Sequence, residues 1–137
     1  MGILQETNKI MMNFLRAIPM MKAIDMAQSL DFYTRILDFE IEGRWPLEGL
    51  PSFANLNRGN VYIQLSTHSG DGAVGSVATI VVDGIDALFD KYLTRGLDTR
   101  GRQNSPVHRG PVDQTWGWRE FYATDPAGNT LRFSQKL

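Results

Sequence analysis

Residues 116–135, Trp-Gly-Trp-Arg-Glu-Phe-Tyr-Ala-Thr-Asp-Pro-Ala-Gly-Asn-Thr-Leu-Arg-Phe-Ser-Gln, contain the clearest structural signal in the chain. Two apolar-rich runs, 119–124 and 130–135, flank the sequence Asp-Pro-Ala-Gly-Asn. These residue types are typical of turns, because they preset or tolerate the backbone angles that a reversal needs. We therefore predict a hairpin of two antiparallel strands.

Upstream of this hairpin, a β-branched run at 77–82 ends at Asp83 and is followed by a helical pattern of apolar residues. That pattern comprises Ile85, Leu88, Phe89, Tyr92 and Leu93, and Gly96 closes it. The first half of the chain has the same order: a strand at 15–22, then a helix with apolar residues at Met26, Leu30, Tyr33 and Leu37. Asp25 and Gln28 resemble a capping box at the start of this helix.

The downstream parts of the two halves also match. Strands are predicted at 40–45, 53–58 and 61–66, and in the second half within 97–112, where the signal is poor, and at 119–124 and 130–135. The pairs Phe53-Ala54 and Gly59-Asn60 correspond to Tyr122-Ala123 and Gly128-Asn129. The chain therefore reads as two βαβββ modules, about 15–66 and 77–135, in a single domain at 15–137 behind a flexible leader at 1–14.

Composition excludes several classes of protein. The 137 residues include 14 Lys and Arg against 15 Asp and Glu, so no basic surface for nucleic acid is predicted. The chain has no cysteine, which excludes disulfides and thiolate metal sites. Neither an export signal nor a membrane span is predicted, and we expect a cytoplasmic protein. Two segments rich in Pro, Gly and polar residues, 46–52 and 103–115, are candidate ligand loops.

Taken together, these residues resemble the bleomycin-resistance branch of the glyoxalase (vicinal oxygen chelate) superfamily. The resemblance rests on Ile18-Pro19, Phe32-Tyr33 and Leu37-Asp38-Phe39, and above all on Trp116-Gly117-Trp118-Arg119-Glu120-Phe121 with the turn that follows. It covers residues from about 15 to 135. One departure is Asp38, where the family usually carries glycine, so the end of the first helix is expected to differ there.

The resemblance implies an α+β fold in which two βαβββ modules form an incomplete barrel with a cleft. Many members hold a divalent metal in that cleft, and the positions that match their ligands here are Ile18, Ile63, Val77 and Arg132. A one-residue slip would replace Ile63 by Tyr62. None of these side chains offers an imidazole or a carboxylate. We expect no metal and no other cofactor.

Candidate ligand-binding residues are Trp45, Phe53, Trp116, Trp118 and Arg132. The aromatic residues lie at predicted strand ends, where they could stack on a ligand, cap the core or fill a dimer interface. Arg132 could pair with Glu120 or bind a ligand carboxylate. Both histidines, His68 and His108, are expected in exposed loops. No catalytic residue is predicted.

The resemblance predicts a homodimer that binds an antibiotic or a similar amphipathic metabolite without altering it and independently of metal. The alternative is an enzyme of the glyoxalase or dioxygenase type, a lyase, isomerase or oxygenase whose site the sequence does not reveal.

Overall fold

The computed structural model describes residues 13–100 and 104–137, so the predicted leader falls almost wholly outside the described residues. The first module contains β1 (Met20–Lys22), α2 (Met26–Asp31), the π-helical turn η1 (Phe32–Ile36), β2 (Glu40–Trp45), β3 (Phe53–Arg58) and β4 (Val61–Ser66). The second contains β5 (Val77–Val81), α3 (Ile85–Thr94), α4 (Pro106–Arg109), β6 (Val112–Asp113), β7 (Trp118–Thr124) and β8 (Thr130–Lys136). The two βαβββ modules are therefore confirmed.

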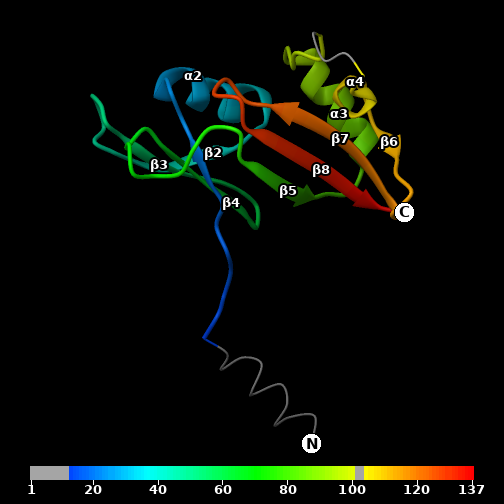
Figure 1. Cartoon of the computed structure of the whole chain (residues 1–137), viewed down its shortest axis with the longest axis horizontal. Helices are drawn as coiled ribbons and strands as arrows, with labels where there is room; N and C mark the ends of the chain where they lie inside the picture. The colour runs from blue at the N-terminus through cyan, green and yellow to red at the C-terminus, as the bar shows by residue number, and fades with distance from the viewer. Residues whose placement is uncertain (1–12, 101–103) are drawn as a thin grey trace, which may run out of the picture.

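Each module builds one four-stranded mixed sheet, in the orders β1-β4-β3-β2 and β5-β8-β7-β6. The first and last strands of a module run parallel, and the hairpins within it are antiparallel. The two sheets lie next to each other in Figure 1, with α2 above the first and α3 above the second. They do not close on each other, which agrees with the predicted incomplete barrel.

Strand alternation sends one side of each sheet into the core beneath the helices. In the second module, Phe121 and Phe133 stack with ring centroids 4.8 Å apart, and Phe89 of α3 meets Phe121 edge-on at 5.0 Å. The first helix begins as predicted, because the Asp25 side chain accepts a hydrogen bond from the backbone N–H of Gln28. Among the described residues, no helix is long and apolar enough to cross a membrane.

Two expectations about local structure need correction. Only residues 20–22 of the predicted strand 15–22 pair with β4, whereas Phe14 and Leu15 are 92% and 85% exposed. A strand needs a neighbour, and the described chain supplies none for them. The predicted loop 103–115, of which residue 103 is not described, contains α4 and β6. Pro106 occupies the first turn of α4, a position where the missing N–H costs nothing.

The two modules are held together by buried and partly buried hydrogen bonds. Tyr33 of the first module donates from its hydroxyl to Asp125 Oδ2 at 2.8 Å, and Tyr92 of the second donates to the carbonyl oxygen of Leu37 at 3.2 Å. Asn129 Nδ2 donates to the carbonyl oxygen of Lys22 at 2.8 Å. Burial raises the pKa of Tyr33 well above its ordinary value, and that of Tyr92 to about 12.

Asp38, the position that departs from the family pattern, forms a second connection between the modules. It adopts a left-handed conformation with φ 69°, which glycine would accept more easily. Its carboxylate lies 2.7 Å from Lys91 Nζ and 3.2 Å from Arg58 Nη1, and it also pairs with Arg95. Burial alone would raise the pKa of Asp38, but hydrogen bonds from Lys91 and Arg95 outweigh this effect and lower it. The ion pairs compensate for the unfavourable backbone conformation.

Candidate functional site

The face of the second sheet turned away from α3, here called its open face, carries a buried carboxylate. Glu120 is only 3% exposed, and its two oxygens accept hydrogen bonds from Ser134 Oγ and Arg132 Nη2, the latter at 3.1 Å. Of the two roles considered for Arg132, the structure shows the pairing with Glu120. A buried carboxylate is stable here because a cation and a hydroxyl satisfy it.

Arg132 keeps hydrogen-bonding capacity beyond this pair. Its Nε is buried without a partner, and its side chain is 32% exposed. The guanidinium carbon lies 5.0 Å from the centroid of the Tyr122 ring. Burial raises the pKa of the Tyr122 phenol, Glu120 adds to this shift and Arg132 opposes it. An arginine with an unpartnered Nε beside an aromatic ring is suited to binding a ligand that carries a planar acid group.

The corresponding face of the first sheet carries two of the predicted aromatic residues. The rings of Trp45 and Phe53 lie 6.2 Å apart, and Trp45 is 56% exposed. Gly43, on the same face, leaves space for the indole, since an added Cβ would lie 2.4 Å from Trp45 Cη2. Opposite Gly43, Asn55 has a buried side-chain oxygen without a partner. This open face therefore also combines aromatic surface with an unsatisfied polar group.

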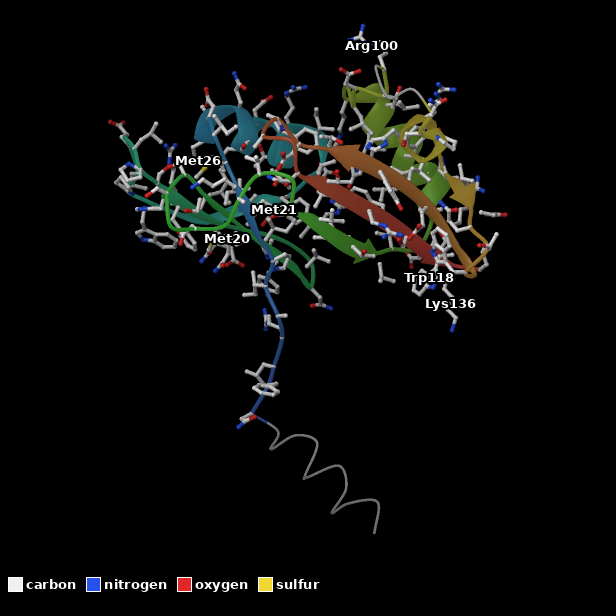
Figure 2. All side chains as sticks on the ribbon, in the orientation of Figure 1. Met20, Met21, Met26, Arg100, Trp118 and Lys136 are labelled. Atoms are coloured by element: carbon white, nitrogen blue, oxygen red, sulfur yellow. The ribbon has the colours of Figure 1, made fainter. Side chains whose placement is uncertain are left out.

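The other two tryptophans lie at the far end of the second sheet. Trp118 pairs with Lys136 across β7 and β8, and Figure 2 shows both near the C-terminus. Trp116 precedes β7 in a turn and is 56% exposed. Within the described chain, no ring contact joins Trp116 or Trp118 to another aromatic residue. The five predicted residues thus lie apart in one chain. Trp45 and Phe53 are on the first sheet, Arg132 is beside Glu120 on the second sheet, and Trp116 and Trp118 are at its far end.

One of the two histidines differs from the sequence prediction. His68 follows β4, as expected, and its carbonyl oxygen accepts from Lys22 Nζ. His108 lies in α4 and is half-buried, with Nδ1 2.7 Å from Ser105 Oγ and Nε2 3.1 Å from Thr124 Oγ1. No sequence signal indicates this arrangement, because Pro106 and Gly110 are also typical of a loop. His108 holds α4 against the edge of β7.

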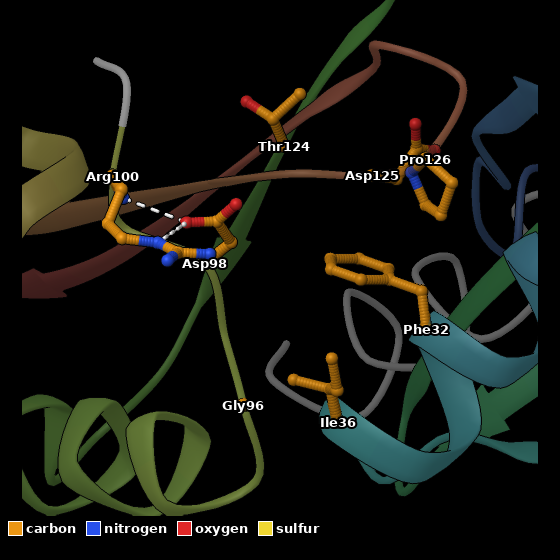
Figure 3. A pocket seen from close by; sticks show the side chains of 8 residues that line it. All are labelled: Phe32, Ile36, Gly96, Asp98, Arg100, Thr124, Asp125 and Pro126. Atoms are coloured by element: carbon orange, nitrogen blue, oxygen red, sulfur yellow. Dashed lines mark hydrogen bonds and ion pairs between the residues drawn. The ribbon is translucent and has the colours of Figure 1, made fainter.

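Thr124 also borders a cavity of about 320 Å³ between the modules. Figure 3 shows Phe32 and Ile36 of η1 on one side, with Asp98 and Arg100 on the other. Asp125 lines it as well, but its Oδ1 accepts from the N–H groups of Ala127 and Asn129, as aspartate side chains commonly do in turns. The Asp125 carboxylate is therefore occupied in holding the turn.

The positions that match metal ligands do not fit a metal. Ile63 is 1% exposed and faces the core, whereas Tyr62, the alternative one residue earlier, lies on the open face. Val77 and Arg132 lie on the open face of the second sheet, and Ile18 precedes β1. In residues 13–100 and 104–137, no three His, Asp or Glu side chains are grouped as metal ligands. A hydrocarbon, a phenol and a paired guanidinium are poor ligands for a divalent cation.

Several solved structures share this fold. The chain is 27% identical to a bleomycin-binding protein from bleomycin-producing Streptomyces verticillus, complexed with copper(II)-bleomycin, covering 93% of this chain and 100% of that one with a TM-score of 0.67. It is 22% identical to another bleomycin-binding protein complexed with bleomycin, covering 90% and 100% with a TM-score of 0.70. TioX from Micromonospora sp. ML1 is 19% identical, covering 90% and 100% with a TM-score of 0.71.

A comparison with curated protein sequences found no significant match. The family model described as "Glyoxalase superfamily protein" matches residues 4–137, nearly the whole chain. With the two βαβββ modules and their open sheets, this match shows that the chain belongs to the glyoxalase superfamily.

Proposed function

We propose that this protein binds an amphipathic small molecule on the open faces of its sheets and releases it chemically unchanged. The observation that carries this proposal is the composition of the two faces: each carries aromatic side chains and a buried, unpartnered polar atom. On the first sheet these are the exposed Trp45 and Asn55 Oδ1. On the second sheet Arg132 Nε lies beside the Tyr122 ring, and the half-buried Trp118 lies farther along the same face of β7. Small-molecule sites typically combine apolar area with a few oriented polar groups.

The relatives support this proposal. Two of the solved structures are bleomycin-binding proteins in complex with bleomycin or copper(II)-bleomycin. Both are complexes of the same fold with a small molecule, which is a precedent for binding by this scaffold. Because fold alone does not fix the ligand, its identity must come from the side chains of this chain.

The site as proposed is completed by a second copy of the chain. The two aromatic groups lie on separate sheets, so a homodimer that faces the first sheet of one chain toward the second sheet of the other would enclose both. Large apolar side chains without cover support this arrangement: Phe14, Leu15, Val77 and Val81 are 92%, 85%, 60% and 63% exposed. A single chain also leaves the outer edges of its sheets unpaired.

Arg132 favours a ligand that carries an acid group. Nη2 is committed to Glu120, while the buried Nε has no acceptor. A carboxylate that approached over the Tyr122 ring would supply one. A strongly cationic drug would instead need acidic side chains in its binding site.

An enzyme is the second candidate, and one observation favours it. Glu120 is a buried carboxylate beside the Tyr122 phenol, and such pairs can move protons in catalysis. However, Ser134 and Arg132 already occupy the oxygens of Glu120. Binding is therefore the function that the geometry supports best.

The test is tryptophan fluorescence with a panel of aromatic glycopeptide and polycyclic antibiotics, each acid being paired with its amide. At least one acid should change the tryptophan emission saturably. Arg132→Gln should weaken binding of that acid by about tenfold and leave binding of its amide unchanged. Mass spectrometry should recover the ligand intact. Recovery of a chemically altered ligand would instead support the enzyme as the function. An equal loss of affinity for the acid and for its amide would contradict the proposed role of Arg132.

A further inference from the structure

Among the described residues, Arg44 in β2 is a cation without a counter-ion. Its partner in the register is the buried Ala54, so its side chain lies on the side of the first sheet that α2 covers. Within residues 13–100 and 104–137, the Arg44 guanidinium forms no hydrogen bond or ion pair, and its Nε is buried without a partner. Removing part of a guanidinium from water without an acceptor is unfavourable. A bound acceptor would remove this cost.

The Arg44 side chain lines a cavity of about 230 Å³ beside the start of α2, near Met26 in Figure 2. The opposite charge in this cavity is Asp25. Asp25 Oδ1 accepts from the backbone N–H of Gln28, and the described chain supplies no partner for Oδ2. Arg44 and Asp25 therefore line one cavity without forming an ion pair with each other. A ligand with both charges would bridge them.

The remaining walls are largely apolar. They come from Ile24, Met26 and Ala27 at the start of α2, and from Gly49 and Leu50. Ile24 and Leu50 are 68% and 66% exposed, so the apolar wall is open to a ligand from solvent. Gly49 and Leu50 belong to the segment 46–52, which the sequence predicts as a ligand loop.

We propose that this cavity binds a small zwitterion, namely a free α-amino acid with an apolar side chain. The carboxylate of the amino acid lies against the Arg44 guanidinium, whose planar N–H groups match a carboxylate. The ammonium group donates to Asp25 Oδ2, and the apolar side chain packs against Ile24 and Leu50. This site lies on the opposite side of the first sheet from Trp45 and Phe53, so it is independent of the proposed ligand site.

The experiment uses isothermal titration of the full chain with three probes of similar shape. L-leucine carries both charges, 4-methylpentanoate lacks the ammonium group and 3-methylbutylamine lacks the carboxylate. Leucine should bind, and each of the other two should bind at least about tenfold more weakly, because each loses one charged hydrogen bond. If leucine does not bind at concentrations up to about 10 mM, or if 4-methylpentanoate binds as well as leucine, the proposal is wrong.

Two variants test which protein charge binds which charged group of leucine. Arg44→Gln should weaken leucine binding by about tenfold or more and leave the binding of 3-methylbutylamine unchanged. Asp25→Asn should weaken leucine binding and leave the binding of 4-methylpentanoate unchanged. Asn is chosen because it is also a good N-cap and therefore preserves the start of the helix. Arg109→Gln, an exposed arginine in α4, is the matched control and should bind leucine normally. Unchanged leucine binding in Arg44→Gln would overturn the proposal.

Trp118→Ala separates this inference from the proposed function. It should leave leucine binding intact, because Trp118 lies in the other module. Parallel loss of leucine binding in Trp118→Ala and Arg44→Gln would place leucine on the open faces and contradict the second site.

Discussion

The Tyr33 hydroxyl donates a 2.8 Å hydrogen bond to Asp125 Oδ2, and this single contact joins the first helix of one module to the hairpin turn of the other. The same carboxylate also accepts from the N–H groups of Ala127 and Asn129 and from Asn129 Nδ2. Tyr33 is fully buried, so no water replaces the hydroxyl if it is removed.

Tyr33→Phe should therefore lower the free energy of unfolding by about 1–3 kcal/mol, because it removes a donor from a buried charge. Tyr92→Phe is the matched control. Its hydroxyl donates to a neutral carbonyl at 3.2 Å, so its loss should cost only about 0.5–1.5 kcal/mol. Urea denaturation of both variants checks the order, and a larger loss in Tyr92→Phe would contradict it.

Asp38→Asn should destabilise the protein by about 1–3 kcal/mol at neutral pH, because Arg58, Lys91 and Arg95 then face each other without a carboxylate. Asn tolerates the left-handed backbone, so the change isolates the charge. The folded-state pKa of Asp38 is below its ordinary value of 3.8. The stabilisation is thus fully present above that value and is lost as the pH falls through the folded-state pKa.

The difference in unfolding free energy between wild type and Asp38→Asn should accordingly be constant near neutral pH and shrink below about pH 4. Asp38→Gly provides a second comparison. It removes the same charge but relieves the backbone conformation, so it should lose less stability than Asp38→Asn. Equal stability of wild type and Asp38→Asn at pH 7 would show that the ion pairs contribute nothing.

If both tryptophans stack on the ligand found by fluorescence, Trp118→Ala and Trp116→Ala should each weaken its binding free energy by on the order of 1–3 kcal/mol. Leu93→Ala, an exposed residue of α3 outside the open faces, is the control and should bind normally. Titration calorimetry gives the affinities, and circular dichroism checks the fold. Unchanged affinity in both tryptophan variants would assign these side chains to the core or to a dimer interface.

The chain should form a homodimer at micromolar concentration by light scattering. Phe14→Ser combined with Leu15→Ser should raise the dimer dissociation constant by about tenfold or more, because both side chains are almost fully exposed in one chain and would be covered in two. Leu93→Ser removes an apolar surface residue of α3, outside the open faces, and should leave the dimer unchanged. A monomer at that concentration would contradict the proposal that a second copy of the chain completes the ligand site.

Much of the fold could be predicted because alternation and turn residues are local signals. The bounds predicted for β2, β3 and β4 agree with the structure to the residue. The strand predicted at 15–22 is confirmed only at 20–22, because pairing depends on a neighbouring strand that the apolar pattern does not reveal. Helix α4 was missed because proline and glycine mark both a loop and the ends of a short helix.

The sites were harder to predict, since they depend on which faces meet. Alternation places Arg132 on the opposite face of β8 from Leu131 and Phe133, and its pairing with Glu120 was one of the two roles that the sequence left open. The hydrogen bonds of His108 required the position of α4 beside β7. Arg44 and Asp25 lie on segments whose approach nothing in the sequence indicates, so their shared cavity was visible only in the structure.

The close approach of Trp45 to Gly43 has a consequence for relatives of this chain. Any side chain at position 43 would push the indole away from its position beside Phe53. The two positions should therefore vary together among homologous sequences. Those that carry alanine or a larger residue in place of Gly43 should have replaced the tryptophan with a smaller residue, and would then recognise different ligands on that face.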